Sequence, residues 1–397
     1  MEFMGYEREN GSIGIRNLIT IIPSVVCSSH AARKIADQVQ NSVCLSHPYG
    51  CGHFGADWRR IVHTLAGIGK NPNVYGALVV GLGCENVTAR VISQEIAKSQ
   101  KPVEFLDIQK VGGTLKTIEK GIQIASKMRE DADKIQKKSF GLDKLILGLE
   151  CGGSDATSGI IANPAVGIAS DEIVKAGGTV ILPEFIEWVG TEHELAKRCA
   201  NPADGETLIE LINTFTEEAQ KQGYNTRLIT PGNIRGGLTT IEEKSLGTVS
   251  KAGKSAIQGL LSYGQNPAAP GLWLMVEPGL DVESMTGLAA AGAQLCTFTT
   301  GQGTPTGNAI MPVIKITGNP ATMKVMGDDI DLDATHILSG DETIASFGQK
   351  ILDEILAVAN GKQTIAEKIG HQELAIWRLP MLFNLAGLSQ KFTRFFE

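Results

Sequence analysis

Short runs of apolar residues alternate with amphipathic segments along the first third of the chain. Each run is continuous, which is typical of a parallel strand that is buried on both faces. The predicted strands are "NLITIIPSVV" (17–26), "SVCLS" (42–46), "VYGALVVGLGCEN" (74–86) and "VEFLDI" (103–108). Helices are predicted at about 28–40, near 56–68, up to about residue 99, and through about residue 137.

The same alternation restarts after residue 140. The predicted strands are "KLILGLECGGSD" (144–155), "TVILPE" (179–184), "GLWLMVEPG" (271–279), "AQLCTFTTGQG" (293–303) and "PVIKITGN" (312–319). Helices are predicted at 163–178 and near 191–223. The segment 224–270 is polar and is interpreted as a long excursion or a domain junction.

These elements together predict an α/β fold. Alternating strands and helices favour right-handed parallel units, so we expect parallel-sheet α/β units in two domains, 1–140 and 141–397. Ligands of such sheets bind outside the carboxyl ends of the strands, where we expect the site. The amphipathic end at 377–397 is expected to dock as a helix on the body or on a second subunit rather than on a membrane.

Composition and charge exclude several classes of protein. The 397 residues exceed one typical core, and the 46 glycines fit an α/β protein with glycine-rich loops at strand ends. A net charge of -7 without basic clusters argues against a nucleic-acid partner. We expect a cytoplasmic protein with no membrane segment, because the chain has neither a signal-like N-terminus nor a long apolar run. In that compartment the seven cysteines are expected to be thiols or metal ligands rather than disulfides.

Cysteines recur at or near predicted strand ends, beside glycine or glutamate. They are Cys51, Cys84, Cys151 and Cys296, with Glu85, Glu150 and Asp155 among their neighbours. If these ends share one crevice, thiolate, imidazole and carboxylate together describe an Fe, Mn or Zn site better than a Mg or Ca site. The alternative is that each cysteine simply packs in a core, where this residue is common. The chain has no CxxC pair, so zinc-ribbon and ferredoxin spacings are absent.

Two glycine-rich segments are predicted to bind an anion or several hydroxyls. "ECGGSDATSG" offers Gly152, Gly153, Ser154 and Asp155 just before a helix start, and "TTGQGTPTGN" offers Thr299, Thr300, Gly301 and Thr304. Arg235 and Lys244 can clamp a carboxylate or can be merely solvated. Neither segment has the order of a nucleotide P-loop, and both can also be connections without a ligand.

Long motifs in a fixed order resemble the altronate and galactarate dehydratase family over nearly the whole chain. The matching stretches are "GYERENGSIGIRN" (5–17), "HPYGCG" (47–52), "GLGCEN" (81–86), "ECGGSDATSGIIANPAVG" (150–167), "EFIEWVG" (184–190), "NIRGGLTTIEEKSLG" (233–247) and "TFTTGQGTPTGN" (297–308). The resemblance implies a lyase that removes water from a sugar acid, altronate or galactarate, to give a 2-keto-3-deoxy acid. It also implies a divalent metal, Fe²⁺ in the first place and Mn²⁺ in the second.

The same resemblance implies a second elimination and a partner. The large subunit of sulfolactate sulfo-lyase is similar and eliminates sulfite instead of water. This chain begins directly at the "GYERENGSIGIRN" motif, without the small N-terminal domain of the longer dehydratases. It therefore resembles the large subunit of a split enzyme, whose missing domain is a separate small subunit, and we expect it to form a homo-oligomer.

Site roles are assigned on this basis as hypotheses. Cys51, Cys84 and Cys151 are the expected metal ligands, with Glu85 and Glu150 as ligands or their partners. The base or acid is expected to be His47 or His53, or Lys315 if burial lowers its pKa. The sequence leaves open whether the metal is a single ion or an iron–sulfur cluster.

Two other classes of function remain as alternatives. A thiol-dependent redox or acyl-transfer enzyme would also place cysteine and histidine at a glycine turn. A non-catalytic subunit that binds a sugar acid would carry the same anion-binding loops without turnover.

Overall fold

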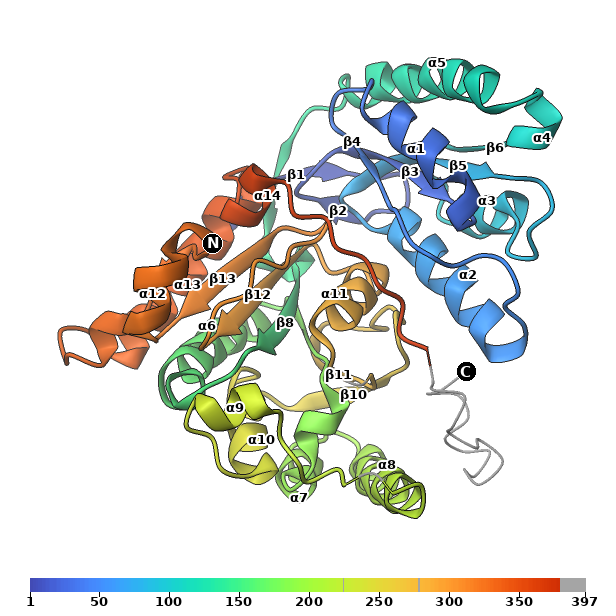
Figure 1. Cartoon of the computed structure of the whole chain (residues 1–397). Coiled ribbons are helices and arrows are strands. Elements are labelled where there is room, and N and C mark those ends of the chain that lie inside the picture. The colour runs from blue at the N-terminus through green and yellow to red at the C-terminus, as the bar shows by residue number, and fades with distance from the viewer. Residues whose placement is uncertain (224, 278, 379–397) are drawn as a thin grey trace.

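The computed structural model describes residues 1–223, 225–277 and 279–378. Two parallel sheets dominate it, each with helices packed on its faces, so the predicted α/β fold is confirmed (Figure 1). The amphipathic end predicted at 377–397 lies outside the described residues, apart from its first two. No helix among the described residues has both the length and the apolar character needed to span a membrane.

The N-terminal sheet has four parallel strands in the order β4-β3-β5-β6. These strands are β3 (Leu18–Pro23), β4 (Ser42–Cys44), β5 (Val74–Gly81) and β6 (Val103–Asp107). Helices cover the sheet: α1 (Ser29–Ala36), α2 (Gly55–Lys70), α3 (Ala89–Ala97), α4 (Ile108–Val111) and α5 (Thr114–Ala132). Alternate residues of the central strand β5 enter two different apolar cores, since Leu78 and Val80 pack with α1 and α5 while Val79 packs with α2 and α3. The strand is thus buried on both faces, as its continuous apolar run predicted.

The C-terminal sheet has seven parallel strands in the order β10-β11-β9-β8-β12-β13-β14. They are β8 (Ile146–Gly152), β9 (Thr179–Leu182), β10 (Ile257–Leu261), β11 (Gly271–Met275), β12 (Leu295–Thr300), β13 (Val313–Thr317) and β14 (Leu332–Asp333). Its larger helices are α6 (Asn163–Lys175), α8 (Pro202–Lys221), α10 (Ile241–Ser250), α11 (Asp281–Ala290) and α13 (Ile344–Ala359). Shorter helices are α7 (Glu192–Lys197), α9 (Pro231–Arg235), α12 (Pro320–Met326) and α14 (Ile365–Ile369).

A small antiparallel sheet links the two ends of the N-terminal region. Its strands are β1 (Glu2–Glu7), β2 (Ile13–Gly14) and β7 (Lys138–Gly141), in the order β2-β1-β7. The register pairs Phe3 with Phe140, and these rings lie 6.4 Å apart between centroids. None of these strands was predicted, because each is short and carries few apolar residues.

The two parallel sheets are packed through a shared core. Helix α2 of the first lies against α11 of the second, and a Cβ on Gly67 would come within 2.8 Å of the carbonyl oxygen of Ala290. The amides of Asn71 and Asn73 are buried and donate to carbonyl groups around the C-terminal sheet, including Ala293 at 2.8 Å. Apolar residues of both sheets belong to one continuous cluster.

The last described residues, 371–378, run as a strap along the boundary between the N-terminal and C-terminal parts and are drawn in red in Figure 1. The hydroxyl of Tyr49 accepts from the backbone of Ile376 at 3.0 Å, and the ring of Trp377 stacks under the guanidinium of Arg60 at 4.3 Å. On the other side, the Trp377 N–H donates to the hydroxyl of Tyr263 at 3.4 Å. The strap therefore joins a loop of the N-terminal sheet to the C-terminal one.

The segment 224–270, expected as a polar excursion, contains regular structure among its described residues. Helices α9 and α10 and strand β10 all form within it. Helix α10 buries Ile241, Ser245, Gly247 and Thr248, which are mostly small or polar residues. Hydrophobic periodicity therefore gave no signal for this helix.

Candidate functional site

The centre of the C-terminal sheet has a switch point at its carboxyl edge. The chain leaves β8 toward β9 on one side and later returns to β12 on the other side of β8. Ligands of open parallel sheets bind at such a point, outside the strand ends. The register pairs Thr300 with Gly152 there, and the backbone N–H of Gln302 donates to Gly153 at 2.9 Å. The two glycine-rich segments predicted from the sequence thus lie side by side.

Asp155 holds these segments together. One of its carboxylate oxygens accepts from the hydroxyl of Thr157 at 2.7 Å and from the N–H of Ser158 at 2.9 Å. The other accepts from the amide of Asn319 at 2.7 Å. A Cβ on Gly301 would collide with this carboxyl group, so only glycine fits there. Asp155 therefore has a structural role at this edge of the sheet, because both of its carboxyl oxygens are used in hydrogen bonds.

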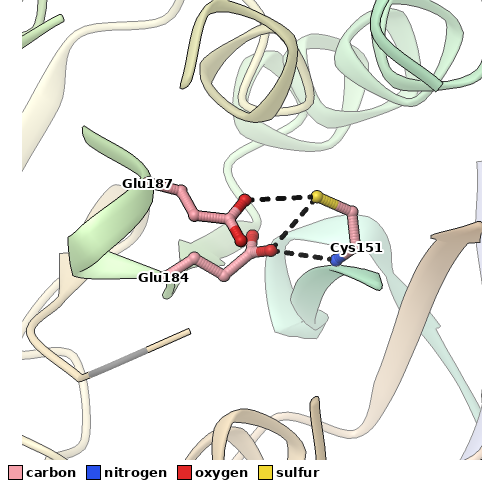
Figure 2. Close-up of side chains that lie close together, drawn as sticks. All are labelled: Cys151, Glu184 and Glu187. Carbon is pink, nitrogen blue, oxygen red and sulfur yellow. Dashed lines mark hydrogen bonds between the residues drawn. The ribbon is translucent and has the colours of Figure 1, made fainter. Parts of the chain in front are cut away.

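A buried thiol and two buried carboxyl groups meet beside this edge (Figure 2). The Sγ of Cys151 lies 3.2 Å from the Oε1 of Glu184 and 3.7 Å from the Oε2 of Glu187. One ligand atom from each residue lies within 4.8 Å of the other two, and no other group of three such residues occurs in the described part of the chain. Cys151 lies near the end of β8, Glu187 lies in the short helical segment Phe185–Trp188 that follows β9, and Glu184 directly precedes that segment.

An unusual backbone conformation aims Glu184 at the thiol. Its φ of 75° is in the left-handed region, which non-glycine residues seldom occupy. The carboxyl group of Glu277 accepts from the N–H of Glu184 at 2.5 Å, and the Oε1 of Glu184 accepts in turn from the N–H of Cys151 at 3.1 Å. Strain at one residue is retained where surrounding contacts fix it, and such positions are frequent at functional sites.

Two lysines pair with the buried carboxyl groups. Lys251 has no exposed side-chain surface and contacts Glu184, which is also fully buried. Lys244 is mostly buried and contacts Glu187. The hydroxyl of Thr248, one turn after Lys244 on α10, donates to Glu187 at 2.6 Å. Helix α10, which periodicity missed, therefore supplies the positive charge of the site.

The protonation states follow from burial and charge. Burial raises the pKa of Glu184 to about 7 and that of Glu277 to about 8. Burial together with Glu184 raises the pKa of the Cys151 thiol to about 12. Burial lowers the pKa of Lys244 and Lys251, but the acidic groups around them outweigh it and raise both above the ordinary value. The two lysines are thus cations, and the thiol keeps its proton.

The residues present fit a divalent cation. Five carboxyl groups (Glu150, Glu184, Glu187, Glu277 and Asp281) interact with one another, and Lys244 and Lys251 are the cations that pair with Glu187 and Glu184. Neither carboxyl oxygen of Glu150 has a hydrogen-bond partner although the side chain is fully buried, and burial raises its pKa well above the ordinary value. A buried carboxyl group without a partner is costly unless it is neutral or faces a cation. One thiolate with carboxylates is a donor set for Fe²⁺, Mn²⁺ or Zn²⁺.

The carboxyl group of Asp281 lies against the glycine loop. It begins α11, and a Cβ on Gly152 would collide with its carboxyl group. Burial and the nearby Glu187 raise its pKa to about 6. A group with this pKa is mostly ionised at neutral pH yet can accept a proton readily. Asp281 thus has the protonation behaviour that a base at the switch point needs.

We expect the Glu277→Gln variant to gain stability relative to the unaltered chain as pH rises from 6.5 to 8. Glu277 has a pKa of about 8 in the fold against an ordinary 4.5, so the folded chain holds an extra proton in this range and loses stability with rising pH. Glutamine mimics the protonated form and lacks this loss. The difference in free energy of unfolding between the variant and the unaltered chain should grow by up to about 1.4 kcal/mol per pH unit. It should level off above pH 8, and urea unfolding measures it. A gap that is constant with pH would contradict the raised pKa.

The other predicted metal ligands lie at a different sheet. Cys51 and Cys84 are exposed on the loops after β4 and β5, and Glu85 follows Cys84. The carboxyl group of Glu85 accepts from the hydroxyl of Ser24 and from the N–H of Gly83, both at 2.7 Å. Among the described residues, neither Cys51 nor Cys84 belongs to a group of three ligand atoms close enough to hold one ion, and their strands lie in a different sheet from that of Cys151.

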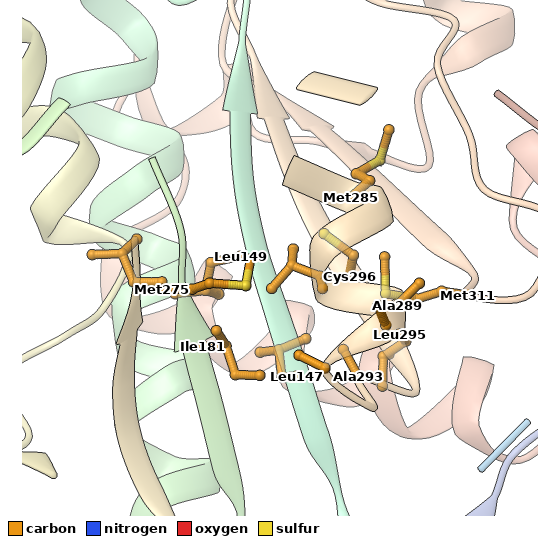
Figure 3. Packing of buried hydrophobic residues seen from close by; sticks show 14 of the residues in the cluster. Leu147, Leu149, Ile181, Met275, Met285, Ala289, Ala293, Leu295, Cys296 and Met311 are labelled. Atoms are coloured by element: carbon orange, nitrogen blue, oxygen red, sulfur yellow. The ribbon is translucent and has the colours of Figure 1, made fainter. Parts of the chain in front are cut away.

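Cys296 lies inside β12 in the apolar core, among Leu295, Ala289 and Met311 (Figure 3). Its side chain is fully buried, and burial raises the pKa of its thiol above the ordinary value. Cys296 is therefore a core residue, which was the alternative to metal binding considered for each cysteine.

The predicted bases also lie apart from the buried carboxyl groups. The Nε2 of His47 is 2.7 Å from the carbonyl oxygen of Pro23, and its Nδ1 accepts from the N–H of Tyr49 at 3.1 Å. Burial lowers the pKa of His47 to about 4, so both ring nitrogens of a neutral imidazole are engaged. His53 is half-buried on the same loop, and burial lowers its pKa as well.

Lys315 and Arg235 are both on the C-terminal sheet's side of the molecule. The Nζ of Lys315 is buried without a hydrogen-bond partner, and burial lowers its pKa, with Asp329 nearby. Arg235 is exposed at the end of α9, whose Asn233 donates to the carbonyl oxygen of Ser154 at 3.0 Å. Arg235 therefore belongs to a helix anchored on the glycine loop, whereas Lys315 lies in the middle of strand β13.

Sequence reasoning did not single out several residues of this site: Glu184, Glu187, Thr248, Lys251, Glu277 and Asp281. The signal for the first two was present, because "EFIEWVG" repeats glutamate after three residues directly beyond a strand. Glu277 and Asp281 likewise follow the end of a strand, β11. Lys251 follows α10 and carried no such signal.

Comparisons with known proteins cover both sheets. The family model described as D-galactarate/Altronate dehydratase, C-terminal, matches residues 142–381, and the one described as D-galactarate dehydratase/Altronate hydrolase, second domain, matches residues 5–133. The (2R)-sulfolactate sulfo-lyase subunit beta of Chromohalobacter salexigens is 37% identical over 95% of this chain and 97% of its own length. The altronate dehydratase of Escherichia coli is 36% identical over 94% of this chain and 77% of its own length. The galactarate dehydratase (L-threo-forming) of the same species is 35% identical over 94% and 76%.

Proposed function

Because this chain belongs to the D-galactarate/altronate dehydratase family and is a lyase, we propose that it removes water from a sugar acid by β-elimination. A proton leaves the carbon next to the carboxylate, the β-hydroxyl departs as water, and the resulting enol becomes a 2-keto-3-deoxy acid. The α-proton is weakly acidic, so the developing negative charge on the carboxylate must be stabilised. The names of two similar proteins as altronate and galactarate dehydratases support this substrate class.

The observation that carries this proposal is the carboxyl edge between β8 and β12. We assign the loop Gly152–Asp155 and the side chains of Thr300 and Thr304, which lie side by side at this edge, to the carboxylate and hydroxyls of the acid. Lys244 is a fixed cation beside them, suited to the charge that develops in the transition state. Asp281, with a pKa of about 6, takes the α-proton. Arg235 and Thr299 complete the residues that we assign to this edge.

Asp281 is preferred as the base to the three residues considered from the sequence. The two ring nitrogens of His47 are occupied by backbone groups, and His53 lies on the loop after β4. Lys315 is enclosed within the sheet face rather than at its edge. His53 and Lys315 remain the next candidates if Asp281 fails.

A divalent metal is proposed to complete the site. Cys151, Glu184 and Glu187 would hold it, with Glu150 beside them. Fe²⁺ is the first candidate for this ion and Mn²⁺ the second. When bound, such an ion acts as a Lewis acid that stabilises the substrate's carboxylate as it gains charge. The Cys151 thiol must lose its proton for this, so metal affinity should rise with pH.

A second reaction is favoured by one specific comparison. The match with this chain covers 97% of the sulfolactate sulfo-lyase subunit beta but 77% of the altronate dehydratase. The second candidate is therefore elimination of sulfite from a 2-hydroxy-3-sulfo acid at the same edge. The word "subunit" in that name supports a separate small partner subunit, which we propose for either reaction.

The deciding experiment is a substrate panel under anaerobic conditions. The chain is assayed with aldonates, aldarates and sulfolactate, with and without a co-expressed small subunit, and both keto acid and sulfite are measured. Keto acid without sulfite supports the dehydratase, and sulfite supports the second candidate. Binding of an acid without any product would instead favour a non-catalytic subunit.

Removal of metal is expected to abolish turnover reversibly. The substrate's developing charge is left to Lys244 alone when the ion is absent, so a chelator should lower the rate by at least about tenfold and added Fe²⁺ or Mn²⁺ should restore it. A coupled assay for the keto acid measures this. A thiol-dependent enzyme would behave in the opposite way, being insensitive to the chelator and inhibited by alkylation.

A further inference from the structure

Three of the seven cysteines are exposed, and all three lie at one edge of the N-terminal sheet. They are Cys27, Cys51 and Cys84, whereas the other four cysteines are half-buried or buried. Each follows a different parallel strand: Cys27 comes after β3, Cys51 after β4 and Cys84 after β5. Cysteine is among the residues most often buried, so three exposed thiols at one edge need an explanation other than packing.

Hydrogen bonds tie the three loops to one another. The N–H of Val26, next to Cys27, donates to the carbonyl oxygen of Tyr49 at 2.9 Å. The N–H of Val87 donates to the carbonyl oxygen of Gly50, next to Cys51, at 3.2 Å. The hydroxyl of Ser24 donates to the carboxyl group of Glu85, next to Cys84, at 2.7 Å. Each thiol is therefore within a few residues of a direct link to the other two loops.

Close backbone approach adds to this arrangement. Gly50 has a φ of 111°, and a Cβ there would lie 2.5 Å from the Cα of Val25, so only glycine lets the second loop lie against the first. The strand order β4-β3-β5-β6 places the switch point of this sheet between β3 and β5. Ligands of parallel sheets bind outside such points.

We propose that Cys27, Cys51 and Cys84 ligate an iron–sulfur cluster at this edge. Soft thiolate ligands select iron–sulfur clusters, zinc or Cu(I) over harder ions. A single ion requires ligand atoms that nearly touch, and within the described ranges only Cys151, Glu184 and Glu187 meet that condition. A four-iron cluster holds its cysteines farther apart, because each thiolate binds a different iron. Three protein thiolates leave one iron open toward solvent.

The protein would then have two metal sites, one for a single ion and one for an iron–sulfur cluster, whereas the sequence left open which of the two a single site would hold. Cys151 is a lone thiol among carboxyl groups in the C-terminal sheet, which suits a single divalent ion. The three exposed thiols have no carboxylate in a comparable role, because the carboxyl group of Glu85 is taken by Ser24 and Gly83. The cluster site is thus a second metal site, and it does not rest on the proposed sugar-acid chemistry.

The test is anaerobic reconstitution of the full chain with equal amounts of ferrous and ferric iron and with sulfide, which together supply the two ferrous and two ferric ions of a four-iron cluster. After desalting, we expect about four iron and about four acid-labile sulfide per chain, with the broad visible absorption of a cluster. The Cys27→Ser/Cys51→Ser/Cys84→Ser variant should lose the sulfide and the absorption. The Cys199→Ser variant is the matched control, because Cys199 is half-buried on the C-terminal side and should leave both unchanged.

A second measurement on the unaltered chain guards against misfolding of the variant. Alkylation of the native protein followed by mass spectrometry should label Cys27, Cys51 and Cys84 in the metal-free form and spare them after reconstitution. Iron bound without sulfide, a cluster retained by the triple variant, or equal labelling before and after reconstitution would each overturn the proposal. These readouts do not require turnover, so they are independent of whether the chain dehydrates any acid.

Discussion

The Asp281→Asn variant is expected to form keto acid with a kcat lower by about 10²- to 10⁴-fold, the usual contribution of a general base. The carboxyl group lies beside Gly152 at the edge, and its pKa of about 6 leaves it ionised at neutral pH. Asparagine has almost the same shape but cannot take the α-proton. Substrate binding should therefore persist, and KM should change little. Steady-state kinetics with the acid identified by the panel measure both quantities.

The matched control is Glu283→Gln, two residues farther along the same helix. This variant removes a carboxyl group of similar surroundings, since burial raises the pKa of Glu283 too, but we assign it no contact with substrate. Its kcat should stay within about twofold of the unaltered chain, an effect too small to report a lost proton transfer. If Asp281→Asn kept full turnover, the base would have to be sought at His53 or Lys315.

The Lys251→Met variant is expected to unfold with a free energy lower by about 3–5 kcal/mol, as when one partner of a buried ion pair is removed. Lys251 and Glu184 have no exposed side-chain surface, so Glu184 would lose the cation that it contacts directly and could not be solvated by water instead. Part of the cost is relieved by protonation, because the pKa of Glu184 is already about 7. The loss should therefore be larger at pH 8 than at pH 6. Urea unfolding at the two values measures it.

Two further variants make this expectation testable. Lys251→Met combined with Glu184→Gln should recover part of the loss, because the unpaired charge is gone. The exposed Lys254, three residues on, should change stability by less than about 0.5 kcal/mol when replaced by methionine. A Lys251→Met protein as stable as the unaltered chain would mean that Glu184 is neutral in the native state at every pH tested.

Most strands of the two parallel sheets could be predicted, because a strand that is buried on both faces needs a continuous run of apolar residues. The apolar run "VYGALVVG" became β5 and "KLILGLECGG" became β8, with ends within a few residues of the expected ones. Helix α11 was not predicted, because residues 284–290 are all buried and so show no alternation of apolar and polar faces. Periodicity detects a helix with an apolar buried face and a polar exposed face. Helix α11 is buried over most of its length, and the buried face of α10 consists mostly of small or polar residues.

The candidate site was only partly accessible from the sequence. The glycine loops at Gly152 and Gly301 were recognised, since their composition itself indicates close backbone approach. The pairing of Glu184 with Cys151 and Lys251 depends on which strands are neighbours, and the order in a sheet is not written in any one segment. For the same reason Cys51 and Cys84 were placed with Cys151, although their strands belong to another sheet.

The shared core described for α2 and α11 has a consequence for how the molecule loses its structure. Apolar residues of both sheets form one cluster, and the strap at 371–378 ties their loops together. Neither sheet can open without exposing the other's interior to water, so the two should melt in a single cooperative transition. A destabilising change at the exposed cysteines and one at the buried lysines would then both shorten the lifetime of the whole folded chain.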